Sequence, residues 1–150
     1  MKNYHFSLEK VLEYRWGLER EAQQELAESE RKLFHEQKRL EFLHKEYGKT
    51  QLALKDKGEE ILNLEELIML SSYLYYLDRK IEEQEEIVLD SEVKVAQDQE
   101  KVKAAMQQRK TLERLKEKDY QDYLAEVNTE EGKKIDEMGL RMFLQQANSS

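Results

Sequence analysis

The side chains of this sequence best suited to chemistry are its three histidines and its many carboxylates, and their spacing keeps them apart. His35 and His44 are nine residues apart, about two and a half turns of helix, and His5 lies far from both in the sequence. Zinc sites need three or four such ligands in one place. General acid–base catalysis needs a concave, partly dry site, whereas these carboxylates are expected on exposed helix faces. We therefore expect no metal, no cofactor, no catalytic residue and no enzymatic activity.

The composition argues against several other classes of site. The five glycines are isolated, so there is no glycine-rich phosphate loop, and there is no cysteine for disulfide or thiolate chemistry. A net charge of −8 argues against nucleic-acid binding, and the basic run Arg109–Lys118 is interrupted by Glu113 and Glu117, as in a solvated helix face. No apolar stretch approaches the ~20 residues of a membrane span. We expect a cytoplasmic protein without membrane insertion, peripheral at most.

Long helices that bury only a narrow stripe are the structure this composition favours. The 150 residues are enough for one domain, 39% of them are charged, and none is proline. Glu, Lys, Gln, Leu, Arg and Ala, all good helix formers, dominate the sequence. High charge alone is also typical of disorder, but the regular apolar spacing favours the coiled-coil class instead.

Two segments carry the heptad pattern, in which apolar residues alternate at steps of three and four. The first predicts a helix over about 7–54, and the second a helix over about 65–145. Between them we expect a turn at about 55–64, because Gly58 tolerates a positive φ, and Asn63 with Glu66 fits a capping box. Asn128 with Glu131 can restart the helix, which predicts a possible kink near 128–132. In the second segment one heptad position is apolar throughout, at Leu67, Leu74, Ile81, Val88, Val95 and Val102.

These two segments predict an all-α fold, a long antiparallel two-helix coiled-coil hairpin that forms a single domain over 1–150. At ~1.5 Å per residue the first helix is roughly 70 Å long and covers the second only to about Leu112. The result is an overhanging C-terminal helix whose apolar stripe lacks an intramolecular partner. Burying such side chains stabilises by ~1.5–3 kcal/mol each, so we expect a partner protein there. The candidate contacts are Leu115, Leu124, Val127 and Ile135, joined by Tyr14 and Trp16 from the first helix.

Aromatic and leucine side chains also gather on both sides of the expected turn, which would form the hairpin tip. They are Leu40, Leu43, Tyr47, Tyr73 and Leu77. In one interpretation they close the seam between the helices. In the other, the tip holds more aromatic area than a two-helix seam can bury, and Tyr73, Tyr75 and Tyr76 cannot all face inward. Tyrosine is favoured at contact surfaces because it has an apolar body and a polar end.

Four segments, in this order along the chain, resemble the bacterial flagellar export protein FliJ family. They are residues 6–15 (FSLEKVLEYR), 73–84, 109–116 (RKTLERLK) and 134–137 (KIDE). The resemblance covers nearly the whole chain. It implies a non-enzymatic, stalk-like component of the flagellar type III protein export apparatus, at the cytoplasmic face of the membrane-embedded machinery. The paired termini would enter the hexameric export ATPase ring, the tip would contact the export gate protein FlhA, and the hairpin would contact export chaperones.

Two other functions fit the residues. One is a generic self-associating coiled coil that serves as a scaffold, which would be a stable dimer, whereas a stalk hairpin is expected to be a monomer alone. The other is a chaperone-like tether that grips clients with its hairpin, as prefoldin subunits do. Prefoldin-like proteins join their hairpins through added strands, and this sequence has no strand signal.

Overall fold

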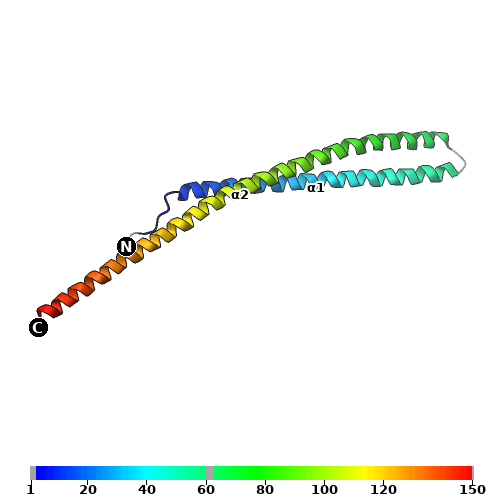
Figure 1. Cartoon of the computed structure of the whole chain (residues 1–150). Coiled ribbons are helices and arrows are strands. Elements are labelled where there is room, and N and C mark those ends of the chain that lie inside the picture. Colours follow the sequence, from blue (N-terminus) through cyan, green and yellow to red (C-terminus); the bar gives the residue numbers. More distant parts are fainter. Residues whose placement is uncertain (1–2, 60–62, 150) are drawn as a thin grey trace. The chain divides into compact units, whose positions relative to one another are not determined.

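The structure, a computed structural model, describes residues 3–59 and 63–149, with the backbone alone at 58 and 59. It contains two α-helices, α1 (Glu9–Glu59, 51 residues) and α2 (Leu64–Asn148, 85 residues). Among these described residues there is no strand. Figure 1 shows the two helices, α1 from blue to cyan and α2 from green to red. The prediction of an all-α helical hairpin is confirmed.

Helix α1 begins two residues later and ends five residues later than the pattern predicts. Its first turn starts where the Glu9 N–H donates to the Phe6 carbonyl at 3.1 Å, and Phe6 is buried there. At the other end the helix continues through Lys55, Asp56, Lys57 and Gly58 to Glu59, so the turn predicted at these residues is wrong. A single glycine in a helix costs only about 1 kcal/mol relative to alanine, and the helix tolerates it here. The connection falls at 60–63, of which 60–62 lie outside the described residues.

The start of α2 shows half of the predicted capping box. The Asn63 side chain accepts a hydrogen bond from the Glu65 N–H at 3.2 Å, as an N-cap residue does. Glu66 forms an ion pair with Lys57 of α1 at 3.1 Å. From this start α2 is helical to Asn148, without interruption at 128–132.

The chain divides into two compact units, and each is described by itself. Unit 1 comprises Met1–Glu19 and Ala105–Ser150, and unit 2 comprises Arg20–Ala104. Each contains one stretch of α1 and one of α2. The single domain over 1–150 stays a prediction.

In unit 2 the helices pack through the heptad seam that the sequence predicts. The buried residues of α2 follow one another at steps of four and three: Leu77, Ile81, Gln84, Val88, Ser91, Val95 and Asp98. Half-buried leucines of α1, such as Leu33, Leu40 and Leu43, supply the other side. The register is antiparallel, because Lys57 pairs with Glu66 while Glu36, earlier in α1, binds Gln84, later in α2.

In unit 1 the same antiparallel register is set mainly by polar contacts. Lys116 pairs with Glu9 at 2.8 Å, and Arg109, earlier in α2, pairs with Glu19, later in α1. Phe6 and Leu12 are the buried hydrophobic residues of this unit. From Asn128 onward every described residue except Gly132 is exposed, which agrees with the predicted overhanging C-terminal helix.

Candidate partner-binding surfaces

The strongest local interaction in unit 1 is a clasp around the Arg109 guanidinium. Its Nε and Nη2 donate to the two carboxylate oxygens of Glu19, at 2.6 and 3.3 Å, and its Nη1 donates to Glu113 at 2.8 Å. The planar guanidinium also lies over the Trp16 ring, 4.2 Å from its centroid. Bidentate pairing and stacking use the geometry that distinguishes arginine from lysine.

The Arg109 clasp is largely buried between α1 and α2 in unit 1. The Arg109 and Glu19 side chains are 13% and 4% exposed. The hydrogen bond to Glu19 raises the pKa of Arg109. The negative charges of Glu19 and Glu113 also raise this pKa, whereas burial lowers it. Trp16, which the sequence predicts as a partner contact, therefore has one ring face committed to Arg109. The heptad pattern singled out neither Glu19 nor Arg109, because charged side chains are expected outside its apolar positions.

The N-terminal segment of unit 1 is held against α2 by a tyrosine cluster. The Tyr4 ring lies 5.0 Å from Tyr120 and 5.3 Å from Tyr123. Its hydroxyl donates to Asp119 at 3.1 Å and lies 3.3 Å from the Lys116 carbonyl oxygen. Burial and the hydrogen bond to Asp119 both raise the pKa of Tyr4. A groove of about 770 Å³ lies beside this cluster, and its α2 side is lined by five acidic residues together with Tyr123, Val127 and Lys134.

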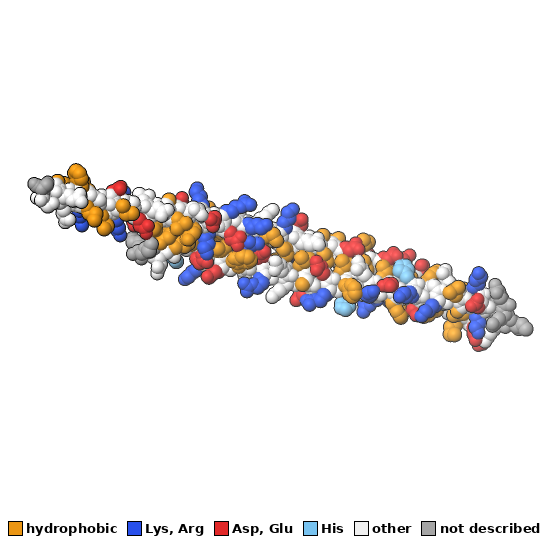
Figure 2. All heavy atoms as spheres, turned by 90° about the horizontal axis from the view of Figure 1, so that it is seen from below, with side chains coloured by type: hydrophobic (Ala, Val, Ile, Leu, Met, Phe, Trp, Pro, Cys, Tyr) orange, Lys and Arg blue, Asp and Glu red, His pale blue; other side chains and the backbone are white. Residues whose placement is uncertain are grey.

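The predicted contact residues of unit 1 are mostly exposed. The exposed fractions are 62% for Tyr14, 41% for Trp16, 47% for Leu115 and 68% for Ile135, whereas Leu124 and Val127 are half-buried. Further exposed apolar side chains follow in the overhang: Met138, Leu140, Met142, Phe143 and Leu144. On a helix these residues fall on several sides, so they do not form a single apolar stripe. Figure 2 shows hydrophobic side chains at the surface between the charged ones.

The five predicted tip residues of unit 2 divide between seam and surface. Leu77 is 2% exposed, so it is a seam residue and offers no free surface. Leu40, Leu43 and Tyr47 are half-buried, and the antiparallel register places them opposite the 73–81 segment of α2. Tyr73 is 40% exposed and lies 6.2 Å from the Tyr76 ring. The seam interpretation holds for Leu77, and Tyr73 remains open to a partner.

The predicted tip contacts omit part of the exposed apolar surface next to the connection. Ile68, Met69, Tyr75 and Tyr76 are each more than half exposed. Basic side chains lie over two of these rings, with the Arg79 guanidinium 6.0 Å from Tyr75 and the Lys80 amine 5.7 Å from Tyr76. The tyrosine surplus was the available signal for the two rings.

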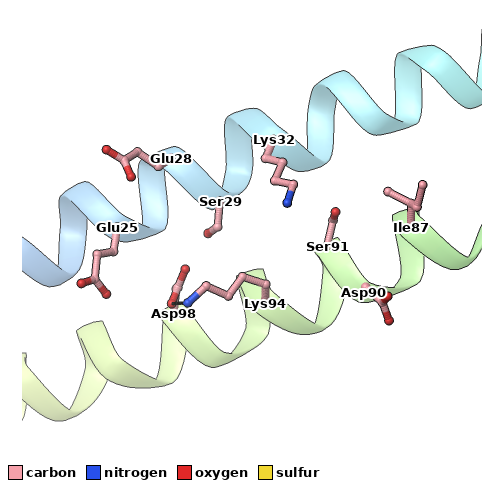
Figure 3. A pocket seen from close by; sticks show the side chains of 9 residues that line it. All are labelled: Glu25, Glu28, Ser29, Lys32, Ile87, Asp90, Ser91, Lys94 and Asp98. Carbon is pink, nitrogen blue, oxygen red and sulfur yellow. Dashed lines mark hydrogen bonds and ion pairs between the residues drawn. The ribbon is translucent and has the colours of Figure 1, made fainter. Parts of the chain in front are cut away.

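Polar residues interrupt the seam of unit 2 and open a cavity of about 510 Å³ between its helices. Figure 3 shows Ser29 and Lys32 of α1 facing Ser91, Lys94 and Asp98 of α2 across it. Asp98 is fully buried; Lys94 donates to one of its oxygens at 3.1 Å, and the other oxygen has no hydrogen-bond partner. Burial alone would raise the pKa of Asp98, but the hydrogen bond from Lys94, the nearby Ser29 hydroxyl and the charges of Lys94 and Lys101 together outweigh burial and lower it.

Metal binding and membrane crossing need features that residues 3–59 and 63–149 lack. In residues 3–59 and 63–149 no group of three or more histidine, cysteine or acidic side chains is placed to hold a metal ion. Neither helix, as far as it is described, is long and apolar enough to cross a membrane.

Comparisons with known proteins agree with this geometry. The model of the flagellar FliJ protein family matches residues 4–148. A solved structure of a YscO homolog from Chlamydia trachomatis superimposes with a TM-score of 0.71 at 18% identity, over 99% of this chain and 100% of that one. At this identity the superposition shows a shared fold. A search of curated proteins gives no significant match. Since the family model spans nearly all of both helices, the chain belongs to the flagellar FliJ protein family.

Proposed function

We propose that this protein is a non-enzymatic, stalk-like component of the flagellar type III export apparatus that works by contact alone. Its family membership makes it an export-associated protein. The proposed partners are the hexameric export ATPase, the export gate protein FlhA and the export chaperones, and the proposed location is the cytoplasmic face of the membrane-embedded apparatus. A monomer alone in solution is expected of such a hairpin.

The observation that carries the ring contact is the unburied apolar surface of unit 1. Ile135, Met138 and Met142 are each more than 60% exposed and share one helix face at steps of three and four. Phe143 and Leu144 extend the apolar surface around the helix. A ring that encloses the helix would bury all of these side chains at once, whereas a flat partner surface would bury only one face.

The tip contact is supported by the exposed aromatic residues beside the connection in unit 2. Tyr73, Tyr75 and Tyr76 present apolar rings and polar hydroxyls, as residues at protein interfaces do. We assign Leu77 to the seam and give it no direct role with FlhA. Leu40, Leu43 and Tyr47 support this surface from the opposite helix.

The alternative functions differ in oligomeric state and in partner. A self-associating scaffold would bury the unit 1 surface against a second copy and form a stable dimer. A chaperone-like tether would bind unfolded clients through the tip without need of the ATPase. The mass of the isolated protein in solution separates the first alternative from the stalk.

The decisive experiment removes the apolar face of the overhang without shortening the chain. The triple variant Ile135→Gln, Met138→Gln, Met142→Gln keeps good helix formers at exposed positions, so the fold should persist. We expect it to lose at least about tenfold in affinity for the purified export ATPase, since three buried apolar side chains are lost from the contact. It should also no longer stimulate ATP hydrolysis.

The matched control makes the same kind of substitution, apolar to glutamine, outside the overhang. Leu89→Gln with Val93→Gln alters two exposed apolar residues of α2 in unit 2. This variant should bind the ATPase like the unaltered chain. Equal loss in both variants, or full binding by the triple variant, would rule out ring insertion through this face.

A further inference from the structure

A second surface, absent from the proposed contacts, lies on the outer face of α1 in unit 2. At about 100° per residue, seven residues between 31 and 52 fall within an arc of about 80°. They are Arg31, Phe34, Lys38, Phe42, Lys45, Lys49 and Leu52. No acidic residue falls in this arc, although the protein carries a net charge of −8. We call these seven residues the basic–apolar face.

This face points away from α2 within unit 2. The half-buried seam residues of α1, among them Leu33, Leu40 and Leu43, centre on the opposite side of the helix. Arg31, Lys38, Lys45 and Leu52 follow at intervals of seven, so the face keeps its orientation when the helices supercoil at 3.5 residues per turn.

The three large apolar side chains of the face are mostly exposed to solvent. Phe34, Phe42 and Leu52 are 56%, 61% and 64% exposed. The Lys38 amine lies 5.4 Å from the centroid of the Phe34 ring, so aromatic and cationic groups are interleaved rather than separated.

The cations of the face are incompletely neutralised. Glu41, at its edge, is shared by Lys38 and Lys45, each at 3.5 Å, and these two lysines lower its pKa. Lys49 lies 3.9 Å from Glu46 with its side chain 76% exposed. Such exposed pairs are weak and readily exchanged for other anions.

We propose that the basic–apolar face binds to a membrane surface that carries acidic lipid headgroups. A convex helix face with phenylalanines between lysines suits the boundary of a bilayer, where rings enter the acyl region and amines stay level with the phosphates. Roughly 30 Å of straight helix lies flat, which a fluid surface accommodates without a shaped groove. A second copy is a poor occupant, because Arg31, Lys38 and Lys45 share one heptad position and would meet like charges.

The test is flotation of the full-length protein with lipid vesicles at low ionic strength. We expect binding to vesicles in which about a third of the lipid is phosphatidylglycerol, and none to pure phosphatidylcholine vesicles. The triple variant Lys38→Gln, Lys45→Gln, Lys49→Gln should bind on the order of a hundredfold more weakly, since each cation near an anionic surface contributes about fivefold. Phe34→Gln with Phe42→Gln should weaken binding about tenfold.

Two matched controls separate this face from diffuse charge or general hydrophobicity. Lys103→Gln, Lys110→Gln, Lys118→Gln removes three exposed cations of α2. Leu89→Gln with Val93→Gln removes two exposed apolar side chains. Both should bind vesicles like the unaltered chain, and circular dichroism should show all variants folded.

Three outcomes would overturn the proposal. The unaltered chain could fail to bind acidic vesicles. The control variants could lose as much vesicle binding as the variants of the basic–apolar face. The face variants could bind vesicles normally and lose only the binding of an acidic protein of the export apparatus. Vesicle binding needs no ATPase, so a failure here is distinct from a failure of the ring contact.

Discussion

Units 1 and 2 hold the same two helices together by different means. In unit 2 the buried residues of α2 keep heptad spacing, with Leu77, Ile81, Val88 and Val95 as the apolar members and Gln84, Ser91 and Asp98 as the polar ones. In unit 1 a buried ion pair, a stacked tryptophan and a tyrosine cluster provide most of the specific contacts. Hydrophobic burial is non-directional, so it stabilises helix packing without selecting one alignment of the two helices. Bidentate and stacked groups have a defined geometry and therefore fix the register. The comparison teaches that a helix can leave its apolar residues free for partners if polar contacts keep it in place.

The largest expected effect tests the aliphatic seam of unit 2. Leu77→Asp places a carboxylate at a position that is 2% exposed, where no partner awaits it. We expect the free energy of unfolding to fall by about 3 kcal/mol or more, measured by urea denaturation followed by circular dichroism. Tyr75→Asp, two residues earlier at a site 66% exposed, is the control and should change it little. Equal losses would contradict the assignment of Leu77 to the seam.

The next effect tests the polar means of unit 1. Arg109→Ala removes the bidentate and stacking contacts and leaves the buried Glu19 carboxylate without its partner. We expect a melting temperature lower by about 5–10 °C, with Arg109→Lys restoring only part of it. Lys110→Ala, at the neighbouring exposed residue, serves as the control. If Arg109→Ala and Glu19→Ala were additive in a double-mutant cycle, the clasp would be ruled out as a coupled unit.

A smaller effect concerns the polar interruption in unit 2 and depends on pH. The folded-state pKa of Asp98 lies below its ordinary value of 3.8, so its contribution to stability is present above that pH and is lost as the pH falls through the folded value. The melting temperature of the unaltered chain should therefore fall on acidification more than that of Asp98→Asn. Thermal melts at neutral pH and below 3.8 provide the measurement. Parallel pH dependence in the two proteins would show that Asp98 does not contribute.

The smallest effect is expected at the tyrosine cluster. Tyr4→Phe keeps the ring contacts with Tyr120 and Tyr123 but loses the hydroxyl contact with Asp119. Because that hydrogen bond is exposed, we expect the melting temperature to change by less than about 2 °C. Tyr4→Ala, which also removes the ring, should expose the N-terminal segment to limited proteolysis. If the phenylalanine variant were cleaved as fast as the alanine variant, the hydroxyl rather than the ring would hold the segment.

The fold was largely predictable because it depends on a repeating local pattern. The run from Leu67 to Val102 fixed the buried face of α2, and the absence of proline made long helices the expected structure. The end of α1 was placed too early because Gly58 was interpreted as a turn, whereas one glycine is a small cost for a long helix.

The binding surfaces were only partly predictable. The exposure of Ile135 follows from the different lengths of the two helices, and the lengths of the two heptad segments predict this difference. The burial of Leu77 follows from its heptad position, whereas the sequence left open which of Tyr73, Tyr75 and Tyr76 face outward. The Arg109–Glu19 pair joins residues 90 apart, which a local pattern does not relate, and the basic–apolar face lies opposite the seam, so the heptad pattern carries no information on it.

The antiparallel register has a consequence for the order in which contacts form. Lys57 and Glu66 are close in sequence on either side of the connection, whereas Tyr4 and Asp119 are separated by 115 residues. Closing a longer loop costs more entropy. The pairing of α1 with α2 is therefore expected to nucleate beside the connection and to propagate toward the ends of the chain. The ends of the chain would then be the last to dock after synthesis.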